Sequence, residues 1–182
     1  MAITADHIRT TLTIYLDAHP EEKADLVPVL DILDTGGDIT SRTEFRGHVT
    51  AGAILADTDG RILHIHHRAL DRWLLPGGHL ETSDKTLLGA ALRELAEETG
   101  IPTDAVNPAE EHPIHIDVHP IPANTAKGEP EHRHVDFRFI FRTTTTTDVR
   151  QLQTEEVTDA TWRKLDSLGD ATLRQRIAAA LR

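Results

Sequence analysis

The sequence has no cysteine and no long apolar run, and each absence excludes a class of protein. Without cysteine, the 182-residue chain can form no disulfide, no thiolate metal site and no thiol nucleophile. No apolar stretch approaches the roughly 18 residues that a membrane-spanning helix needs. The opening residues, MAITADHIRTTL, lack a basic patch followed by an apolar block, so we expect no signal peptide. The expectation is a cytoplasmic protein with no membrane partner.

Positive charge is also scarce. Nineteen lysines and arginines face 30 acidic residues, which gives a formal net charge of −11. Nonspecific binding to nucleic acid depends on basic side chains that neutralise phosphates, so we expect no nucleic-acid partner. A small anionic substrate is still compatible with this charge, because bound divalent ions invert the local sign of a site lined by carboxylates. The length fits one domain with an added segment.

Residues 74–101, LLPGGHLETSDKTLLGAALRELAEETGI, form the stretch that carries the most chemistry. Apolar residues recur there at spacings of three and four, which predicts an amphipathic helix. Pro76-Gly77-Gly78 precedes it and allows a tight turn whose backbone carbonyl can face the helix. We expect Ser83 or Asp84 to cap the helix and Gly100 to end it. The predicted buried face consists of Leu88, Ala91, Leu92, Leu95 and Thr99.

The opposite face of this helix carries Arg93 and the carboxylates of Glu94, Glu97 and Glu98. Like charges at these spacings repel each other, so the pattern predicts a cation that offsets the repulsion. A hard divalent ion, Mg²⁺ or Mn²⁺, prefers oxygen ligands of this kind. A solvated acidic helix face is the alternative reading, but the glycine turn, the arginine and the glycine stop together favour a metal site.

The same stretch resembles the signature of the Nudix hydrolases, G-x5-E-x7-R-E-U-x-E-E-x-G-U, where U is a bulky aliphatic residue. Residues 93–101, RELAEETGI, match the second half at every specified position. The first half is one residue longer than the pattern, with Asp84 six places after Gly78 and Lys85 eight places before Arg93. In the family the first glutamate supports the loop, and the departure leaves the role of Asp84 open.

The resemblance implies an α/β protein with an α-β-α sandwich and a mixed sheet over residues 46–182. It implies metal-dependent hydrolysis of a pyrophosphate bond in a nucleoside diphosphate linked to another moiety. Glu97 and Glu98 would be the main metal ligands, Glu94 the third and the Gly77 carbonyl a further one, while Arg93 would hold the carboxylates in place.

The general base and the substrate contacts are less closely defined. Glu155 and Glu156 precede a predicted strand in a region where such enzymes often place an extra carboxylate, and Glu129 and Glu131 are rivals. The predicted substrate-binding residues lie on or beside expected loops: His79, Lys127, His132 and Arg133.

Three other functions compete with hydrolysis. A noncatalytic Nudix-like module that senses a nucleotide would typically have lost the carboxylates that this chain keeps. A Nudix-like isomerase of isoprenoid diphosphates would need a cysteine. A histidine-based zinc or iron enzyme is the third, because the chain has twelve histidines and His64, His66 and His67 follow one another in a predicted strand. We expect most of these histidines to be ordinary strand residues.

Residues 1–45 lie outside the resemblance and predict a pair of helices followed by a linker. The first begins near Thr4 or Asp6, with Ile8, Leu12, Tyr15 and Leu16 on one face. The second begins at Pro20, is kinked by Pro28, carries Leu26, Val29, Leu30 and Leu33, and ends at Gly36-Gly37. Such short helices need a partner surface. They could cover the core, form a homodimer contact or reach toward the active site, and we favour the homodimer.

Alternating patterns predict the strands of the sheet. They place a hairpin around Thr58-Asp59-Gly60, a short strand at residues 73–75, and longer strands at residues 114–121 and 134–142. Residues 102–111 and 122–132 read as loops, a further strand ends near Trp162, and a last helix ends at Arg182.

Overall fold

The computed structural model describes residues 2–126, 128–143 and 156–182. Its helices are α1 (Ala5–Ala18), α2 (Val27–Asp34), α3 (Leu87–Thr99) and α4 (Ala171–Ala180), with 3₁₀ turns at Pro20–Lys23, Thr103–Ala105 and Leu165–Ser167. Its strands are β1 (His48–Ala56), β2 (Ile62–His67), β3 (Arg72–Leu74), β4 (Gly77–His79), β5 (Val106–Pro108), β6 (His115–Ile121), β7 (His132–Thr143) and β8 (Val157–Arg163). Among the described residues, no helix is both long enough and apolar enough to cross a membrane.

The strands form one mixed sheet built around β1. The order along the main path is β3-β2-β1-β7-β5, while β4 pairs with β1, β6 with β7 and β8 with β2. β1 runs parallel to β7 and antiparallel to β2 and β4. All nine of its residues are buried, as expected for a strand covered on both faces. The predicted hairpin is present, with Asp57–Arg61 as the turn between β1 and β2.

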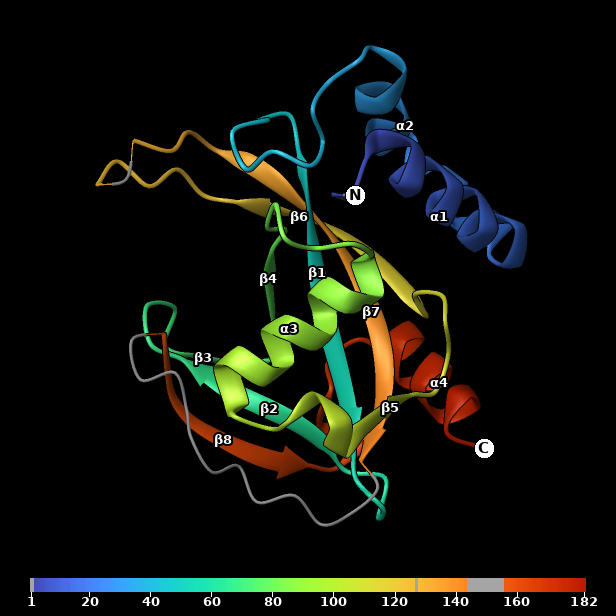
Figure 1. The fold of residues 1–182 in the computed structure, drawn as a ribbon, viewed down its shortest axis with the longest axis vertical. Coiled ribbons are helices and arrows are strands. Elements are labelled where there is room, and N and C mark those ends of the chain that lie inside the picture. The colour runs from blue at the N-terminus through green and yellow to red at the C-terminus, as the bar shows by residue number, and fades with distance from the viewer. Residues whose placement is uncertain (1, 127, 144–155) are drawn as a thin grey trace.

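Helices cover both faces of the sheet, so the predicted α-β-α sandwich is confirmed (Figure 1). On one face, α3 packs its buried Leu87, Ala91 and Leu95 into the cluster that holds the phenylalanines of β7. On the other face, Leu173 and Ile177 of α4 pack in a second, smaller cluster. Neighbouring residues of a strand point to opposite faces, which is why β1 and β7 contribute to both clusters.

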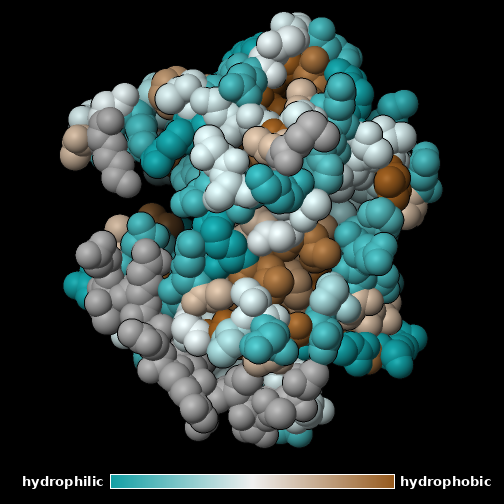
Figure 2. All heavy atoms as spheres, in the orientation of Figure 1, coloured by the Kyte–Doolittle hydropathy of each residue, from teal (hydrophilic) through white to brown (hydrophobic). Residues whose placement is uncertain are grey.

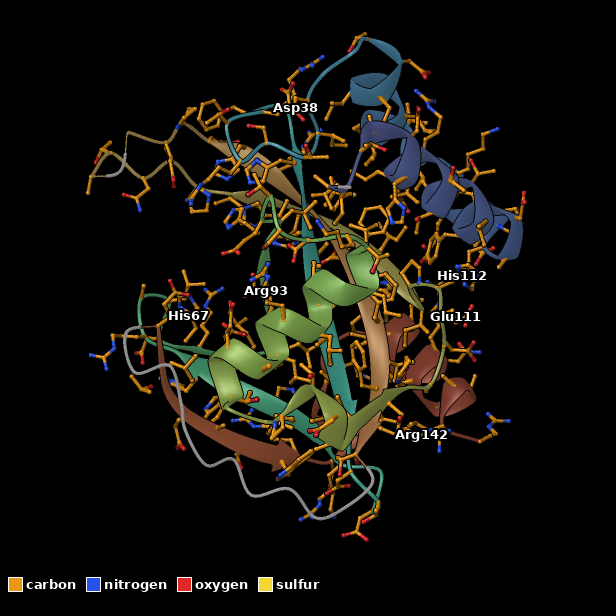
Figure 3. The ribbon with its side chains drawn as sticks, in the orientation of Figure 1. Asp38, His67, Arg93, Glu111, His112 and Arg142 are labelled. Carbon is orange, nitrogen blue, oxygen red and sulfur yellow. The ribbon has the colours of Figure 1, made fainter. Side chains whose placement is uncertain are left out.

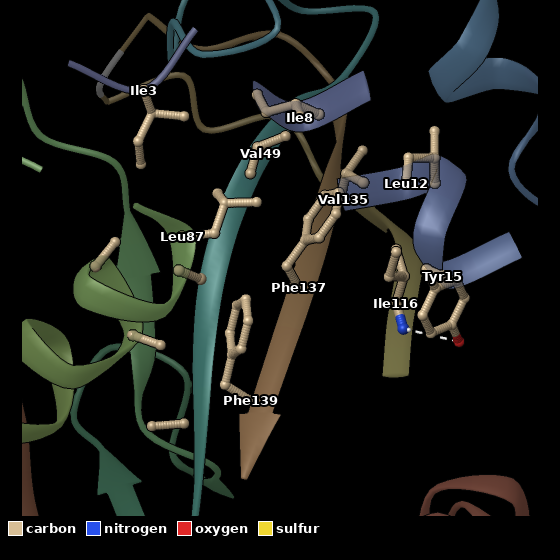
Figure 4. Packing of buried hydrophobic residues seen from close by; sticks show 14 of the residues in the cluster. Ile3, Ile8, Leu12, Tyr15, Val49, Leu87, Ile116, Val135, Phe137 and Phe139 are labelled. Atoms are coloured by element: carbon tan, nitrogen blue, oxygen red, sulfur yellow. Dashed lines mark hydrogen bonds between the residues drawn. The ribbon is translucent and has the colours of Figure 1, made fainter. Parts of the chain in front are cut away.

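The N-terminal helices dock on the chain's own sheet. Ile8, Leu12 and Tyr15 of α1 are almost completely buried and lie beside Val135 of β7, as Figure 4 shows. The hydroxyl of Tyr15 accepts a hydrogen bond from the backbone N–H of Ile116 in β6 at 3.2 Å. The apolar stripe that motivated the homodimer prediction is therefore covered within one chain, and core cover is the arrangement observed.

The second predicted helix is wrong in its details. It is a 3₁₀ turn at Pro20–Lys23 followed by a separate helix, α2, with Pro28 in its first turn. Proline lacks the N–H that a helix interior needs but fits a first turn, so Pro28 starts a helix instead of kinking one. Ile32, which the predicted stripe omitted, is buried, whereas Leu30 is only half-buried.

Two strands also differ from the prediction. β7 begins at His132, two residues before the predicted start, because it pairs with β6 along its first half. β5 lies inside a segment predicted as loop, and its three residues pair with the end of β7. So short a strand carries too little alternation to be recognised from sequence. The threonine run continues from Thr143 beyond the described residues.

The docking of α1 predicts a stability effect with a matched control on the same helix. Leu12→Ala should lower the free energy of unfolding by ~2–5 kcal/mol, because it leaves a cavity in the core. Ile14, which is 39% exposed, should tolerate alanine within about 0.5 kcal/mol. Urea unfolding of both variants measures the difference. If the α1 stripe instead served a second chain, Leu12→Ala would change the oligomeric mass in solution and leave monomer stability nearly unchanged.

Candidate active site

Helix α3 carries the candidate site and is fixed at both ends. The Thr86 hydroxyl accepts from the Gly89 N–H at 3.0 Å and caps the start, whereas Ser83 and Asp84 were the predicted caps. Gly100 ends the helix in the left-handed region at φ 67°, as predicted for this residue. With the apolar side of α3 packed on the sheet, the polar side of the helix projects toward β4 and the preceding loop.

Arg93 links the carboxylates of this polar side. Its Nη1 donates to Glu94 Oε1 at 3.0 Å and to Glu97 Oε2 at 2.9 Å, and its Nη2 donates to the backbone carbonyl of His79 at 3.0 Å. Figure 3 shows Arg93 leaving α3 on the side that faces β4. Charge-assisted bonds of this kind are shorter and stronger than neutral ones. Arg93 therefore joins the helix, two of its glutamates and strand β4.

Asp84 holds Arg93 from the loop. Its two carboxylate oxygens accept from Arg93 Nε and Nη2, both at 3.0 Å, and Oδ2 also accepts from the Glu81 N–H at 2.7 Å. Burial by itself raises the pKa of Asp84, but the bonds from Arg93 and Glu81 more than offset it and leave the pKa below its usual value. Asp84 thus supports the loop against the arginine, which is what the resemblance ascribes to the first glutamate of the signature.

Glu98 is buried and Glu94 half-buried beside the glycine turn. Glu98 Oε2 accepts from the Gly77 N–H at 2.9 Å. Burial raises the pKa of Glu98 to about 8 against that bond, and the negative charges of Glu94 and Glu156 add to the rise. Burial likewise raises the pKa of Glu94 to about 7, although Arg93 beside it acts in the opposite direction. Without a cation, this pair of carboxyl groups resists holding two full charges.

The Pro76-Gly77-Gly78 turn needs glycine for close approach. A Cβ on Gly78 would lie 2.6 Å from Glu94 Oε1, and one on Gly77 would lie 2.8 Å from the Ala51 carbonyl oxygen. Both contacts are far inside van der Waals distance. The absence of side chains therefore lets β4 pass between β1 and the carboxylates of α3.

These carboxyl groups predict a pH effect in protein stripped of metal by EDTA. A carboxyl with a raised pKa in the folded state contributes stability that is complete below its unfolded pKa and lost as pH rises through its folded pKa. For Glu98, whose pKa rises from 4.5 to about 8 on folding, stability should fall as pH rises through this range and level off above it, so the last part of the fall lies between about pH 7 and 9. This window lies above the range in which the buried histidines titrate.

Urea unfolding at pH 7 and pH 9 tests this effect, with Glu98→Gln as the comparison. The variant should show a clearly smaller fall, since glutamine does not ionise. Equal pH dependence in both proteins would show that Glu98 is not the titrating group.

The remaining predicted site residues lie in different surroundings. Glu156 is exposed just before β8, and its charge acts on both Glu94 and Glu98. Glu155 and Lys127 lie outside the described residues. His132 and Arg133, expected on a loop, are the first two residues of β7. They line a cavity of about 850 Å³ beside β6, and no residue of α3 lines that cavity.

A notch lies on the side of the molecule to which Arg93 projects. Figure 2 shows the hollow between the loop joining β6 and β7 and the β2–β3 turn. A substrate that contacted both the α3 carboxylates and the β6–β7 loop would span this notch.

A cluster of histidines was missed by the sequence analysis. Neighbouring rings lie with centroids 4.9 to 5.7 Å apart at the end of the sheet where β1 and β7 begin. Burial lowers the pKa of His79 to about 4 and that of His134 to about 3, so both rings are neutral at pH 7. The members come from four strands: His48, His79, His119, His132 and His134.

The sequence carried one signal for this cluster. His132 and His134 are two apart, and so share a face of any strand that contains both. The sequence pattern instead indicated His64, His66 and His67 as candidate metal ligands. There, His64 Nδ1 lies 3.1 Å from the Ile62 carbonyl oxygen and His66 Nδ1 lies 2.8 Å from the Thr158 hydroxyl. Within the described ranges, none of these three belongs to a set of convergent metal-ligating groups.

Comparison with known proteins defines the class. The family described as "NUDIX domain" matches residues 46–182. That range covers more than half of the chain and contains every residue of the candidate site. The chain therefore belongs to the Nudix family of hydrolases, as its signature predicted.

Individual relatives are more distant. A protein of Lactococcus lactis subsp. cremoris named "Probable DHNTP pyrophosphohydrolase" is 27% identical over 125 residues, which span 66% of this chain and 69% of that protein. A NUDIX-family hydrolase from Clostridium perfringens has a similar structure, with a TM-score of 0.54 and 20% identity, over 74% of this chain and 95% of that one. The E. coli dihydroneopterin triphosphate pyrophosphohydrolase gives a TM-score of 0.52 and 19% identity, over 72% and 92%. These structural similarities concern the fold.

Proposed function

We propose that this Nudix-type pyrophosphohydrolase carries out metal-dependent hydrolysis of a pyrophosphate bond in a nucleoside diphosphate linked to another moiety. The observation that carries the proposal is the pair of buried Glu98 and half-buried Glu94 on the helix that matches the family signature, the first held by the Gly77 N–H and the second by Arg93. Strongly perturbed carboxyl groups at a conjunction of loop and helix are typical of functional sites.

The donor set fits a hard divalent ion. Glu94, Glu97 and Glu98, with the Gly77 carbonyl, would hold Mg²⁺ or Mn²⁺, since these ions prefer oxygen. The raised pKa values of Glu94 and Glu98 support this assignment, because burial disfavours their negative charge and a bound cation would offset that cost. When bound, such an ion neutralises charge on the phosphates and acidifies a coordinated water.

The protein's own residues position and activate the reaction. Asp84 holds the guanidinium of Arg93, and Arg93 in turn fixes the orientation of Glu94 and Glu97. Glu156 is the proposed general base among the described residues, because its charge acts on Glu94 and Glu98 while its own side chain is exposed to solvent. Glu155 is its rival. A base must reach the attacking water, which an exposed carboxylate beside the site can do.

The proposed substrate contacts need one refinement. His79 lies next to the glycine turn, and its carbonyl already binds Arg93. Lys127 belongs to the connection between β6 and β7, and Arg133 is exposed at the start of β7. Buried His132 is the weakest of the four assignments, because its ring packs face to face with that of His48.

The domain assignment is also a proposal. Residues 46–182 would carry the catalytic fold, and residues 1–45 would be an extension that completes its core. A homodimer stays a prediction, and no surface described above requires one.

A second candidate substrate follows from the L. lactis relative, whose name specifies a DHNTP pyrophosphohydrolase. Dihydroneopterin triphosphate also contains a phosphoanhydride chain, so the same carboxylates could act on it. The 27% identity supports including this pterin triphosphate in any substrate test.

A substrate panel tests the proposed function. Nucleoside diphosphate sugars, diadenosine tetraphosphate and dihydroneopterin triphosphate would be incubated with the protein and Mg²⁺ or Mn²⁺, and phosphorus NMR would identify the products. We expect cleavage of a phosphoanhydride bond that EDTA abolishes. Tight binding of one of these compounds without any cleavage would support the noncatalytic sensing module and refute the hydrolase.

A further inference from the structure

Three of the five imidazole rings in the histidine cluster come together from three different strands. His48 pairs with His134 in the register between β1 and β7, and His79 is opposite Thr50, two residues along β1. The ring centroids of His48, His79 and His134 are 4.9 to 5.2 Å apart. Each strand alternates its side chains, so this register places all three rings on the same face of the sheet.

His48 is the member whose surroundings point to a ligand. His48 is 1% exposed. In the described part of the chain, its Nε2 is the only buried side-chain nitrogen or oxygen without a hydrogen-bond partner. Leaving such an atom unpaired is costly. Its Nδ1 lies 3.3 Å from the Glu44 carbonyl oxygen. An Nδ1–H donating to that carbonyl leaves a lone pair on Nε2, which is the arrangement that usually orients metal-binding histidines.

The three rings offer nitrogen atoms at a spacing close to that of a metal site. One ring nitrogen from each of His48, His79 and His134 lies within 4.8 Å of the other two. In a tetrahedral zinc site, with Zn–N distances near 2.0 Å, ligand nitrogens are about 3.3 Å apart. Small side-chain rotations would close this difference. We propose that His48, His79 and His134 bind one Zn²⁺ ion, with a water molecule as the fourth ligand.

This zinc site is separate from the carboxylates of α3. Gly78 faces Glu94, so its neighbour His79 points to the opposite face of the sheet. The two sites also differ in chemistry, because imidazole suits zinc whereas carboxylates suit Mg²⁺ and Mn²⁺. The inference therefore goes beyond the proposed hydrolysis and does not depend on it.

Zinc bound at this position would stabilise the active site through one hydrogen bond. The backbone carbonyl of His79 accepts from Arg93 Nη2 at 3.0 Å. An ion that fixes the His79 side chain to β1 and β7 would also fix that carbonyl, and with it the arginine that orients Glu94 and Glu97. We therefore assign the zinc a structural role that supports the glycine turn.

Metal binding to the full chain tests the proposal. Metal-stripped wild-type protein and the variants His79→Gln, His134→Gln and His112→Gln would be titrated with Zn²⁺, and with Co²⁺ as a spectroscopic substitute. We expect wild type to bind one Zn²⁺ per chain and to give the intense visible absorption of four-coordinate Co²⁺. Each ligand variant should bind zinc at least ~10-fold more weakly. His112 is exposed in a loop outside the cluster, so His112→Gln should bind like wild type.

Two further measurements distinguish this site from zinc binding at the carboxylates and from loss of folding in a variant. The double variant Glu97→Gln, Glu98→Gln disables the carboxylate site and should keep its zinc affinity. Circular dichroism and melting of each variant without metal show whether it folds, and zinc should raise the melting temperature of wild type but not of folded His134→Gln. The proposal fails if wild type binds no zinc, if His79→Gln and His134→Gln bind zinc as tightly as wild type, or if binding disappears in the glutamate variant.

Discussion

The Glu98→Gln variant should lose at least ~10²-fold in kcat while keeping its fold, as expected when a group that stabilises transition-state charge is removed. Glutamine retains an oxygen that can accept the Gly77 N–H, which the carboxylate now binds at 2.9 Å. It removes the charge that would hold the cation. The side chain is buried.

The measurement is kcat at saturating Mg²⁺ and again at saturating Mn²⁺, on whichever substrate the panel identifies. Glu111→Gln is the matched control, because Glu111 is an exposed acid on a loop away from Arg93 (Figure 3). It should retain wild-type kcat. Glu97→Gln should fall in the same range as Glu98→Gln. Wild-type activity in either of those two variants would refute the assignment of metal ligands.

Asp84→Ala should have the second largest effect, on stability and on activity together. The change removes both oxygens that Arg93 Nε and Nη2 bind, and it frees the Glu81 N–H. Breaking a buried charge pair by removing one partner costs about 3 kcal/mol or more. Arg93 keeps Glu94 and Glu97 as partners, so we expect a loss near the lower end of that range. Because Arg93 also orients the two glutamates, kcat should fall by roughly tenfold or more.

Ser83→Ala provides the control for Asp84→Ala. Ser83 is exposed in the same loop and makes only a 3.3 Å hydrogen bond to Glu81. Its replacement should change stability by less than ~0.5 kcal/mol. Urea unfolding gives the stability of each variant, and steady-state kinetics gives kcat and KM. If Asp84→Ala matched Ser83→Ala in both, the loop would not depend on the contact with Arg93.

Because of the extra residue in the signature, the role of Asp84 could not be predicted from the sequence. Residue counting left Asp84 without a defined role, because aspartate is one methylene shorter than the glutamate of the pattern and stands one residue too far from Arg93. The folded loop brings the Asp84 carboxylate onto the guanidinium at 3.0 Å through both oxygens. Loop length and side-chain length have compensated each other, and a count along the chain cannot register that compensation.

In the N-terminal segment, too, the local structure follows from the sequence but the surface against which it packs does not. The apolar stripe of α1 and its start near Thr4 follow from local pattern, and both are present. The surface that covers the stripe was a choice between the chain's own core and a second chain. The answer depends on where β6 and β7 lie, and those strands are more than a hundred residues away from Tyr15 in sequence.

The sequence by itself determined the features that depend on neighbouring residues. Helix α3, its glycine stop, the turn before it and the β1–β2 hairpin follow from periodicity and turn chemistry within short windows. The family signature in residues 93–101 belongs to the same group. It identified the class of enzyme because the chemistry requires its carboxylates at fixed spacing on one helix.

Only the tertiary structure decided which distant residues meet. The register of β1 against β7 and β4 places His48 beside His134 and His79, and a slip of one residue would point these rings to the opposite face. Burial by the whole fold raises the pKa of Glu98 to about 8, while Glu97 on the same helix is exposed. Strand register and burial are properties of long-range packing, and local sequence patterns do not encode them.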